Sequence, residues 1–166
     1  MDDALGFYGV LVGAGVTLIG TVLVPWLRDH LDRRRRQQDQ ERLERRDWLM
    51  TALAELLNMR QAKATRDGSV GAAQARYGAA FNQLTIRLTP DEQPVLDILN
   101  AMLAIVQEPT AQTPSIVGNA MLVLTLWERG DIKTSQVLNE VESRAHLKFD
   151  YTRGPEPIVS YIPPGT

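Results

Sequence analysis

An uncharged run of 24 residues near the start of the chain limits its fold more than any other feature. Residues 4–27 read ALGFYGVLVGAGVTLIGTVLVPWL. As a helix rising about 1.5 Å per residue, this run would be about 36 Å long, enough to cross a hydrocarbon core of about 30 Å. A helix that is apolar on every face could otherwise be buried only in a core larger than the rest of this chain supplies. The run therefore predicts a transmembrane helix over residues 4–27, after a short extracytoplasmic N-terminus of residues 1–3.

The flanks of the run predict that it is an uncleaved signal anchor with a defined orientation. The preceding MDD lacks the basic residues of a cleavable signal peptide, and the run ends in Pro25, Trp26 and Leu27. Arginines close to a span stay on the cytoplasmic side. We therefore predict a single-pass protein of the plasma or inner membrane, with the N-terminus outside and the C-terminal domain in the cytoplasm. The arginines expected to fix this topology and to lie against anionic lipid are Arg28, Arg33, Arg34, Arg35 and Arg36.

Small residues recur at a spacing of four within the predicted span. They are Gly9, Gly13, Thr17 and Thr21. A stripe of small residues lets two helix backbones approach closely in lipid, so it favours a homo-oligomer through the transmembrane helix. Glycine is also simply common in membrane helices, and the two interpretations stay open.

Residues 28–47 are densely charged, with eight arginines and six acids. Several acids precede an arginine by four positions, as in Asp29–Arg33 and Glu41–Arg45, a spacing that supports a solvated helix. Leu31 and Leu43 alone do not provide the apolar seam of a coiled coil. The stretch is therefore predicted to be a juxtamembrane helical spacer. The interleaved acids, with a net charge of −2 for the whole chain, argue against nucleic acid as a partner.

From Trp48 to Leu147 apolar residues recur at three- and four-residue spacing, which is typical of amphipathic helices. We predict a small cytoplasmic helical domain of about four helices over residues 48–147, with breaks at 66–69, 108–114 and 129–131. The TPDE sequence, Thr89 to Glu92, has capping-box spacing, although Pro94 could mark the helix start instead. Residues 115–129 form the most apolar stretch and are predicted to be the buried central helix.

The last residues, 148–166, are rich in proline and glycine and are predicted to form an extended tail. Its apolar residues could lie in a groove of the domain or on a partner, and a frayed end is the alternative. The apolar residues are Ile158, Val159, Tyr161 and Ile162. The whole chain is thus predicted to be all-α with an irregular tail.

Few residues offer catalytic chemistry. The chain has no cysteine, and its two histidines, His30 and His146, lie far apart in sequence. Phosphate-loop, nucleophile-elbow and zinc-protease motifs are absent, so we expect no catalytic, cofactor-binding or metal-binding residues and no enzyme activity. A non-catalytic scaffold, adaptor or regulatory subunit, whose cytoplasmic domain binds an unknown protein partner, fits these features best. A small membrane-active protein of phage type is the alternative, and an enzyme with a dispersed site near His146 is a third reading.

Overall fold

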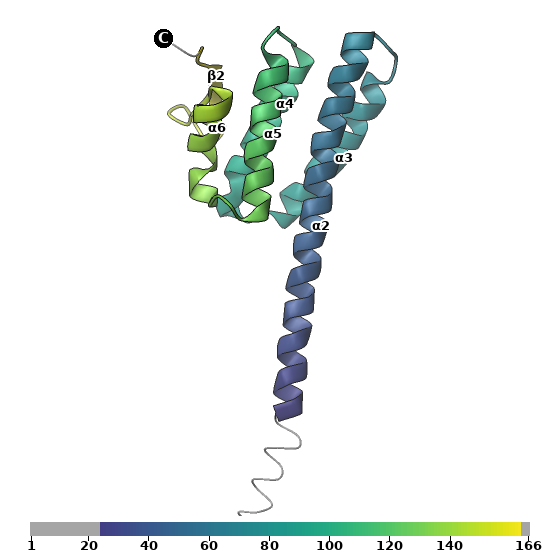
Figure 1. Cartoon of the computed structure of the whole chain (residues 1–166), viewed down its shortest axis with the longest axis vertical. Helices are drawn as coiled ribbons and strands as arrows, with labels where there is room; N and C mark the ends of the chain where they lie inside the picture. Colours follow the sequence, from purple (N-terminus) through teal and green to yellow (C-terminus); the bar gives the residue numbers. More distant parts are fainter. Residues whose placement is uncertain (1–23, 164–166) are drawn as a thin grey trace, which may run out of the picture. The chain divides into compact units, whose positions relative to one another are not determined.

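The computed structural model describes the backbone of residues 24–163 and the side chains from residue 40 onward (Figure 1). The chain divides into two compact units, residues 1–43 and residues 44–166. Helix α2, Val24–Thr65, begins in the first unit and continues into the second without a break. The predicted spacer, residues 28–47, therefore has a helical backbone and does not end before the domain begins.

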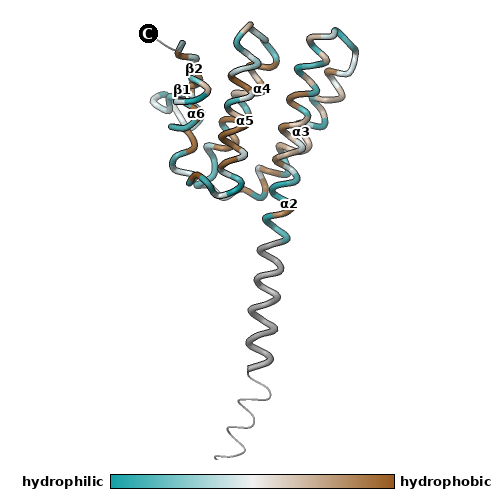
Figure 2. The backbone as a smooth tube through the Cα atoms, in the orientation of Figure 1, coloured by the Kyte–Doolittle hydropathy of each residue, from teal (hydrophilic) through white to brown (hydrophobic). Residues whose placement is uncertain are grey.

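The second unit is a helical domain, as predicted. After α2 the chain forms α3 (Val70–Arg87), a 3-10 turn η2 (Pro90–Glu92), α4 (Gln93–Gln107) and α5 (Thr113–Arg129). A second 3-10 turn η3 (Thr134–Gln136) leads into α6 (Val137–Ala145). Two short strands, β1 (Leu147–Asp150) and β2 (Ile158–Tyr161), end the described chain. Figure 2 shows hydrophobic residues gathered along α4 and α5.

The described chain is mostly helical, in agreement with the predicted all-α fold, and the tail that was predicted to be irregular contains an antiparallel hairpin. Leu147 pairs with Tyr161 and Asp150 with Ile158, so the tail adds a two-stranded sheet to the helices. Helix α6 ends at Ala145 because His146 takes the left-handed conformation (φ 57°), and its N–H caps the Glu142 carbonyl. Leu147 therefore belongs to a strand and not to the predicted last helix.

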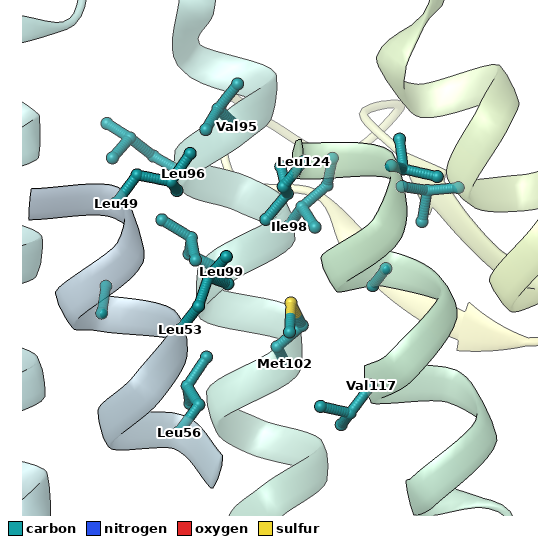
Figure 3. Close-up of a cluster of buried hydrophobic side chains, with 14 of the residues drawn as sticks. Leu49, Leu53, Leu56, Val95, Leu96, Ile98, Leu99, Met102, Val117 and Leu124 are labelled. Carbon is teal, nitrogen blue, oxygen red and sulfur yellow. The ribbon is translucent and has the colours of Figure 1, made fainter. Parts of the chain in front are cut away.

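Helix α4 is the most buried helix of the domain. Eight of its 15 residues are buried, against seven of 17 in α5, which was predicted to be central. Figure 3 shows Leu53 of α2 on one side of α4 and Val117 of α5 on the other. Helix α4 also contacts α3 and α6. Its position among these neighbours, and not the length of its apolar run, decides its burial.

TPDE and Pro94, the two sequence features that could mark the start of α4, both contribute to the observed structure. TPDE forms the 3-10 turn, in which the Glu92 carboxylate accepts hydrogen bonds from the Thr89 N–H (2.9 Å) and hydroxyl (3.1 Å). The α-helix itself then begins at Gln93, with Pro94 in its first turn. The N–H groups in the first turn of a helix have no partner within the helix, so a proline there costs no helical hydrogen bond. The regular helix therefore starts next to Pro94 and not at Thr89.

The predicted transmembrane helix lies almost entirely outside the described residues. Only residues 24–27 of the 4–27 run are described, as the start of α2. Between residues 24 and 163, none of the helices combines the length and the apolar composition that crossing a bilayer requires.

Tyr77 connects α3 to α4 through a buried hydrogen bond. It is 2% exposed, and its hydroxyl donates to the Leu99 carbonyl at 2.9 Å. A helical carbonyl has a second lone pair, so this bond leaves the α4 helix intact. Burial raises the pKa of the Tyr77 hydroxyl well above its ordinary value, because the phenolate would have to lose its hydration.

This shift predicts a loss of stability in alkali. Tyrosine in the unfolded chain ionises near pH 10, whereas Tyr77 in the folded domain stays neutral, so stability is full below about pH 10 and falls above it. Each pH unit beyond this point costs up to about 1.4 kcal/mol. Tyr77→Phe should lower stability at pH 7 by about 1 kcal/mol and flatten the alkaline slope in denaturant titrations between pH 7 and 11. An unchanged slope in the variant would contradict this account of Tyr77.

Candidate functional site

A groove with a volume of about 1180 Å³ runs beside α4. One wall is the outer face of α4, which contributes Gln93, Asp97 and Asn100. The hairpin contributes the β2 strand and the Pro155–Pro157 loop to another part of the lining. The segment between α4 and α5 completes it with Glu108, Thr110 and Gln112. The groove thus depends on the hairpin that the helical pattern did not predict.

Asp97 is a buried carboxylate in the α4 wall, with only 6% of its surface exposed. Its Oδ1 accepts a hydrogen bond from Gln93 Nε2 at 3.1 Å, and its Oδ2 accepts one from the Tyr151 hydroxyl at 2.8 Å. Both donors are neutral, and no ion pair joins Asp97 to a cation among the side chains of residues 40–163. The carboxylate is therefore satisfied in hydrogen bonds while its charge has no direct counter-ion.

The bond from Tyr151 fastens the strand-connecting loop to α4. Burial raises the pKa of the Tyr151 hydroxyl, and the hydrogen bond to Asp97 and the negative charge of Asp97 raise it further. The hydroxyl consequently stays protonated at neutral pH and remains a donor. Because 54 residues separate the two partners, this contact holds together parts of the chain that are distant in sequence.

The charge of the groove has one sign. Its lining contains three acids, Asp97, Glu108 and Glu156, and no lysine, arginine or histidine among the described residues that line it. Glu108 and Glu156 are exposed to solvent. The remaining lining is neutral and includes apolar surface from Ile105, Ile116 and Leu147. The groove is accordingly suited to a ligand that is cationic and partly apolar.

The strand β2 lines this groove, and within the described residues 24–163 its edge away from β1 pairs with no other strand. The N–H of Ile162 donates to the His146 carbonyl at 2.8 Å, which fixes the hydrogen-bonded positions of the ladder. In an antiparallel pair these positions alternate, so the N–H and C=O groups of Val159 and Tyr161 point away from β1. Val159 and Tyr161 both line the groove and pack against the core. The edge is therefore fixed by packing, and the backbone N–H and C=O groups of Val159 and Tyr161 can hydrogen-bond to an added strand.

A second polar cluster lies around Arg45 of α2. Its Nη1 donates to Glu92 Oε1 at 2.8 Å, its Nε lies 3.4 Å from Glu128 Oε2, and its guanidinium carbon is 5.0 Å from the centre of the Trp127 ring. The indole N–H of Trp127 in turn donates to the Thr134 hydroxyl at 3.0 Å. One arginine thus connects α2 with the turn before α4 and with the end of α5.

Glu128 is only partly satisfied in this cluster. Burial raises its pKa, whereas the positive charges of Arg45 and then Arg46 oppose that shift. Among the side chains of residues 40–163, neither Arg45 Nε nor Glu128 Oε2 finds a hydrogen-bond partner, so their 3.4 Å contact is ionic only. We interpret the cluster as a structural tie between elements and not as a ligand site.

The site residues predicted from sequence lie outside the part of the chain whose side chains the structure describes. Gly9, Gly13, Thr17 and Thr21 lie outside the described residues, as do the side chains of Arg28 and Arg33–Arg36. His146 caps α6 and is half-buried, and its ring stands nearly perpendicular to that of Tyr161, with 6.4 Å between the ring centroids. Among the described side chains, residues 40–163, no group of three or more potential ligands could hold a metal ion.

Sequence reasoning missed Asp97 and the strand edge. The signal for Asp97 was a single acid inside the apolar stretch VLDIL, because a charged residue on a buried face needs partners. The signal for the hairpin was LKFDY and IVSYI, two runs rich in strand-forming residues on either side of a proline- and glycine-rich turn.

Comparisons with family models, with curated proteins and with solved structures found no match for this chain.

The cluster around Arg45 predicts an unequal response to two arginine substitutions. Arg45→Ala leaves the carboxylates of Glu92 and Glu128 partly buried without their shared cation, and we expect a loss of about 2–3 kcal/mol in unfolding free energy. Arg129→Ala is the matched control. Arg129 is 67% exposed beside Asp131, so its loss should change stability by no more than about 0.5 kcal/mol. Equal effects in denaturant unfolding would contradict the tie described here.

Proposed function

We propose that this chain is a single-pass membrane protein whose helical domain acts by binding, as a non-catalytic scaffold, adaptor or regulatory subunit. Support for the anchor comes from the 24 uncharged residues of the 4–27 run and from the arginines that follow it. Support for a binding role comes from the groove beside α4. The orientation, with the domain in the cytoplasm, rests on the same arginines.

The observation that carries the binding role is the open β2 edge beside a groove of about 1180 Å³. Small-molecule pockets commonly have volumes of about 300–1,000 Å³, so this groove is at or above their upper limit. An extended protein segment matches such a groove with a strand edge, because backbone pairing adds affinity along its length. The partner is therefore proposed to be another protein.

The anchor predicts how the full-length chain behaves in a cell fraction. After expression, the chain should stay with the membrane through a sodium carbonate wash, because a spanning helix is not removed by charge or high pH. Val16→Arg with Leu18→Arg should release it, since each arginine at a helix centre costs about 2.5–3.5 kcal/mol on insertion. The matched control is Val16→Leu with Leu18→Ile, which should remain in the membrane. Release of the unmodified chain by carbonate would remove the anchor from this proposal.

Self-association through the span is a separate part of the proposal. In a mild detergent, the unmodified chain should migrate as an oligomer, and Gly9→Leu with Gly13→Leu should shift it toward monomer by separating the backbones. A monomer both with and without these substitutions would remove self-association and leave the anchor unaffected.

A further inference from the structure

We infer that the groove beside α4 receives an extended, lysine- or arginine-containing segment of a partner protein, which pairs through its backbone with β2. This inference rests on the proposed binding function and gives the partner its chemistry. Two independent observations carry it: the open strand edge and the acidic lining, to which the buried carboxylate of Asp97 belongs.

The strand edge gives the partner its conformation. Val159 and Tyr161 each direct one N–H donor and one C=O acceptor away from β1, toward the place where a third strand would lie. A chain accepted there must be extended, because only an extended backbone matches donors and acceptors at every second residue. The hairpin resists rearrangement on binding because its inner face packs on the core and Tyr151 is bonded to Asp97.

The acids give the partner its charge. Asp97, Glu108 and Glu156 all line the groove without a lysine, arginine or histidine among the described lining. Asp97 is nine-tenths buried, and its hydrogen-bond donors, Gln93 and Tyr151, are neutral. Its negative charge is therefore poorly screened by solvent and favours a cation entering the groove. An acidic segment would meet repulsion from all three carboxylates.

The two requirements together specify a pattern along the partner. Side chains of a strand alternate between two faces, so a cationic residue at every second position places all the cations on one side. Apolar residues at the intervening positions keep the segment extended through their strand preference. Alternating lysine and valine is the simplest sequence of this kind.

The direct test measures binding of a fluorescent heptapeptide of alternating valine and lysine to the full-length chain in a non-ionic detergent. We expect saturable binding by fluorescence anisotropy. The same peptide with glutamate in place of lysine should bind at least about tenfold more weakly, because each charge contact is reversed in sign. No binding of the lysine peptide, or equal binding of both peptides, would overturn the inference.

Substitutions in the groove locate the site. Glu108→Gln with Glu156→Gln removes two exposed charges without disturbing the core, and affinity for the lysine peptide should fall about tenfold. The matched control, Asp47→Asn with Glu142→Gln, removes two exposed acids away from the groove and should leave affinity within about twofold. Equal loss in both variants would mean nonspecific charge attraction and would overturn the assignment to this groove.

N-methylation tests the backbone pairing. Two further versions of the lysine peptide are used, one with N-methyl groups on the odd residues and one with N-methyl groups on the even residues. Each version removes the N–H donors along one edge of the added strand. One peptide of this pair should retain binding and the other should lose it, and any other result would overturn pairing with β2. Failure of these peptide assays leaves the membrane anchor standing, whereas release by carbonate removes the anchor and leaves the groove unaffected.

Discussion

The burial of α4 is the constraint on which the domain depends. Its apolar residues lie between those of α2 and α5 (Figure 3), and the helix also contacts α3 and α6. The remaining face, with Gln93, Asp97 and Asn100, lines the groove. One helix therefore supplies both the centre of the core and a wall of the candidate site. A rigid core helix is a firm support for a binding surface, because its side chains cannot shift without disturbing packing on every other side.

The hairpin turns this free face of α4 into a groove. Its inner face packs on the core, and the Tyr151 hydroxyl reaches Asp97 at 2.8 Å. A two-stranded hairpin alone is marginal in water, so these attachments to the helices are what keep it in place. The resulting strand has one edge paired with β1 and one edge open, which is the arrangement that peptide-binding domains use for strand addition. An open edge is a hazard for aggregation, and the single short strand here limits that hazard.

The helices of residues 48–145 could be predicted from sequence because their apolar residues recur with the helical period. TPDE and Pro94 likewise located the start of α4 within four residues. The hairpin could not be predicted in the same way, since a four-residue strand shows only two residues per face and its partner follows a seven-residue loop. Asp97 was missed because its burial depends on the hydrogen bond from Tyr151. Sequence spacing gives no indication that two residues 54 positions apart will be in contact. Helix α5 is buried as predicted, and the larger buried share of α4 reflects its position among neighbouring helices, which a single amphipathic stripe does not reveal.

The central claim is that a fixed strand edge stands open beside α4. Amide hydrogen exchange of the full-length chain, resolved by residue, tests it most directly. We expect the amides of Val159 and Tyr161 to exchange at least about tenfold faster than that of Ser160, which donates to β1, with the buried part of α4 slowest of all. Equal protection of Val159, Ser160 and Tyr161 in the free chain would mean that the outer edge is already covered, and would contradict the account.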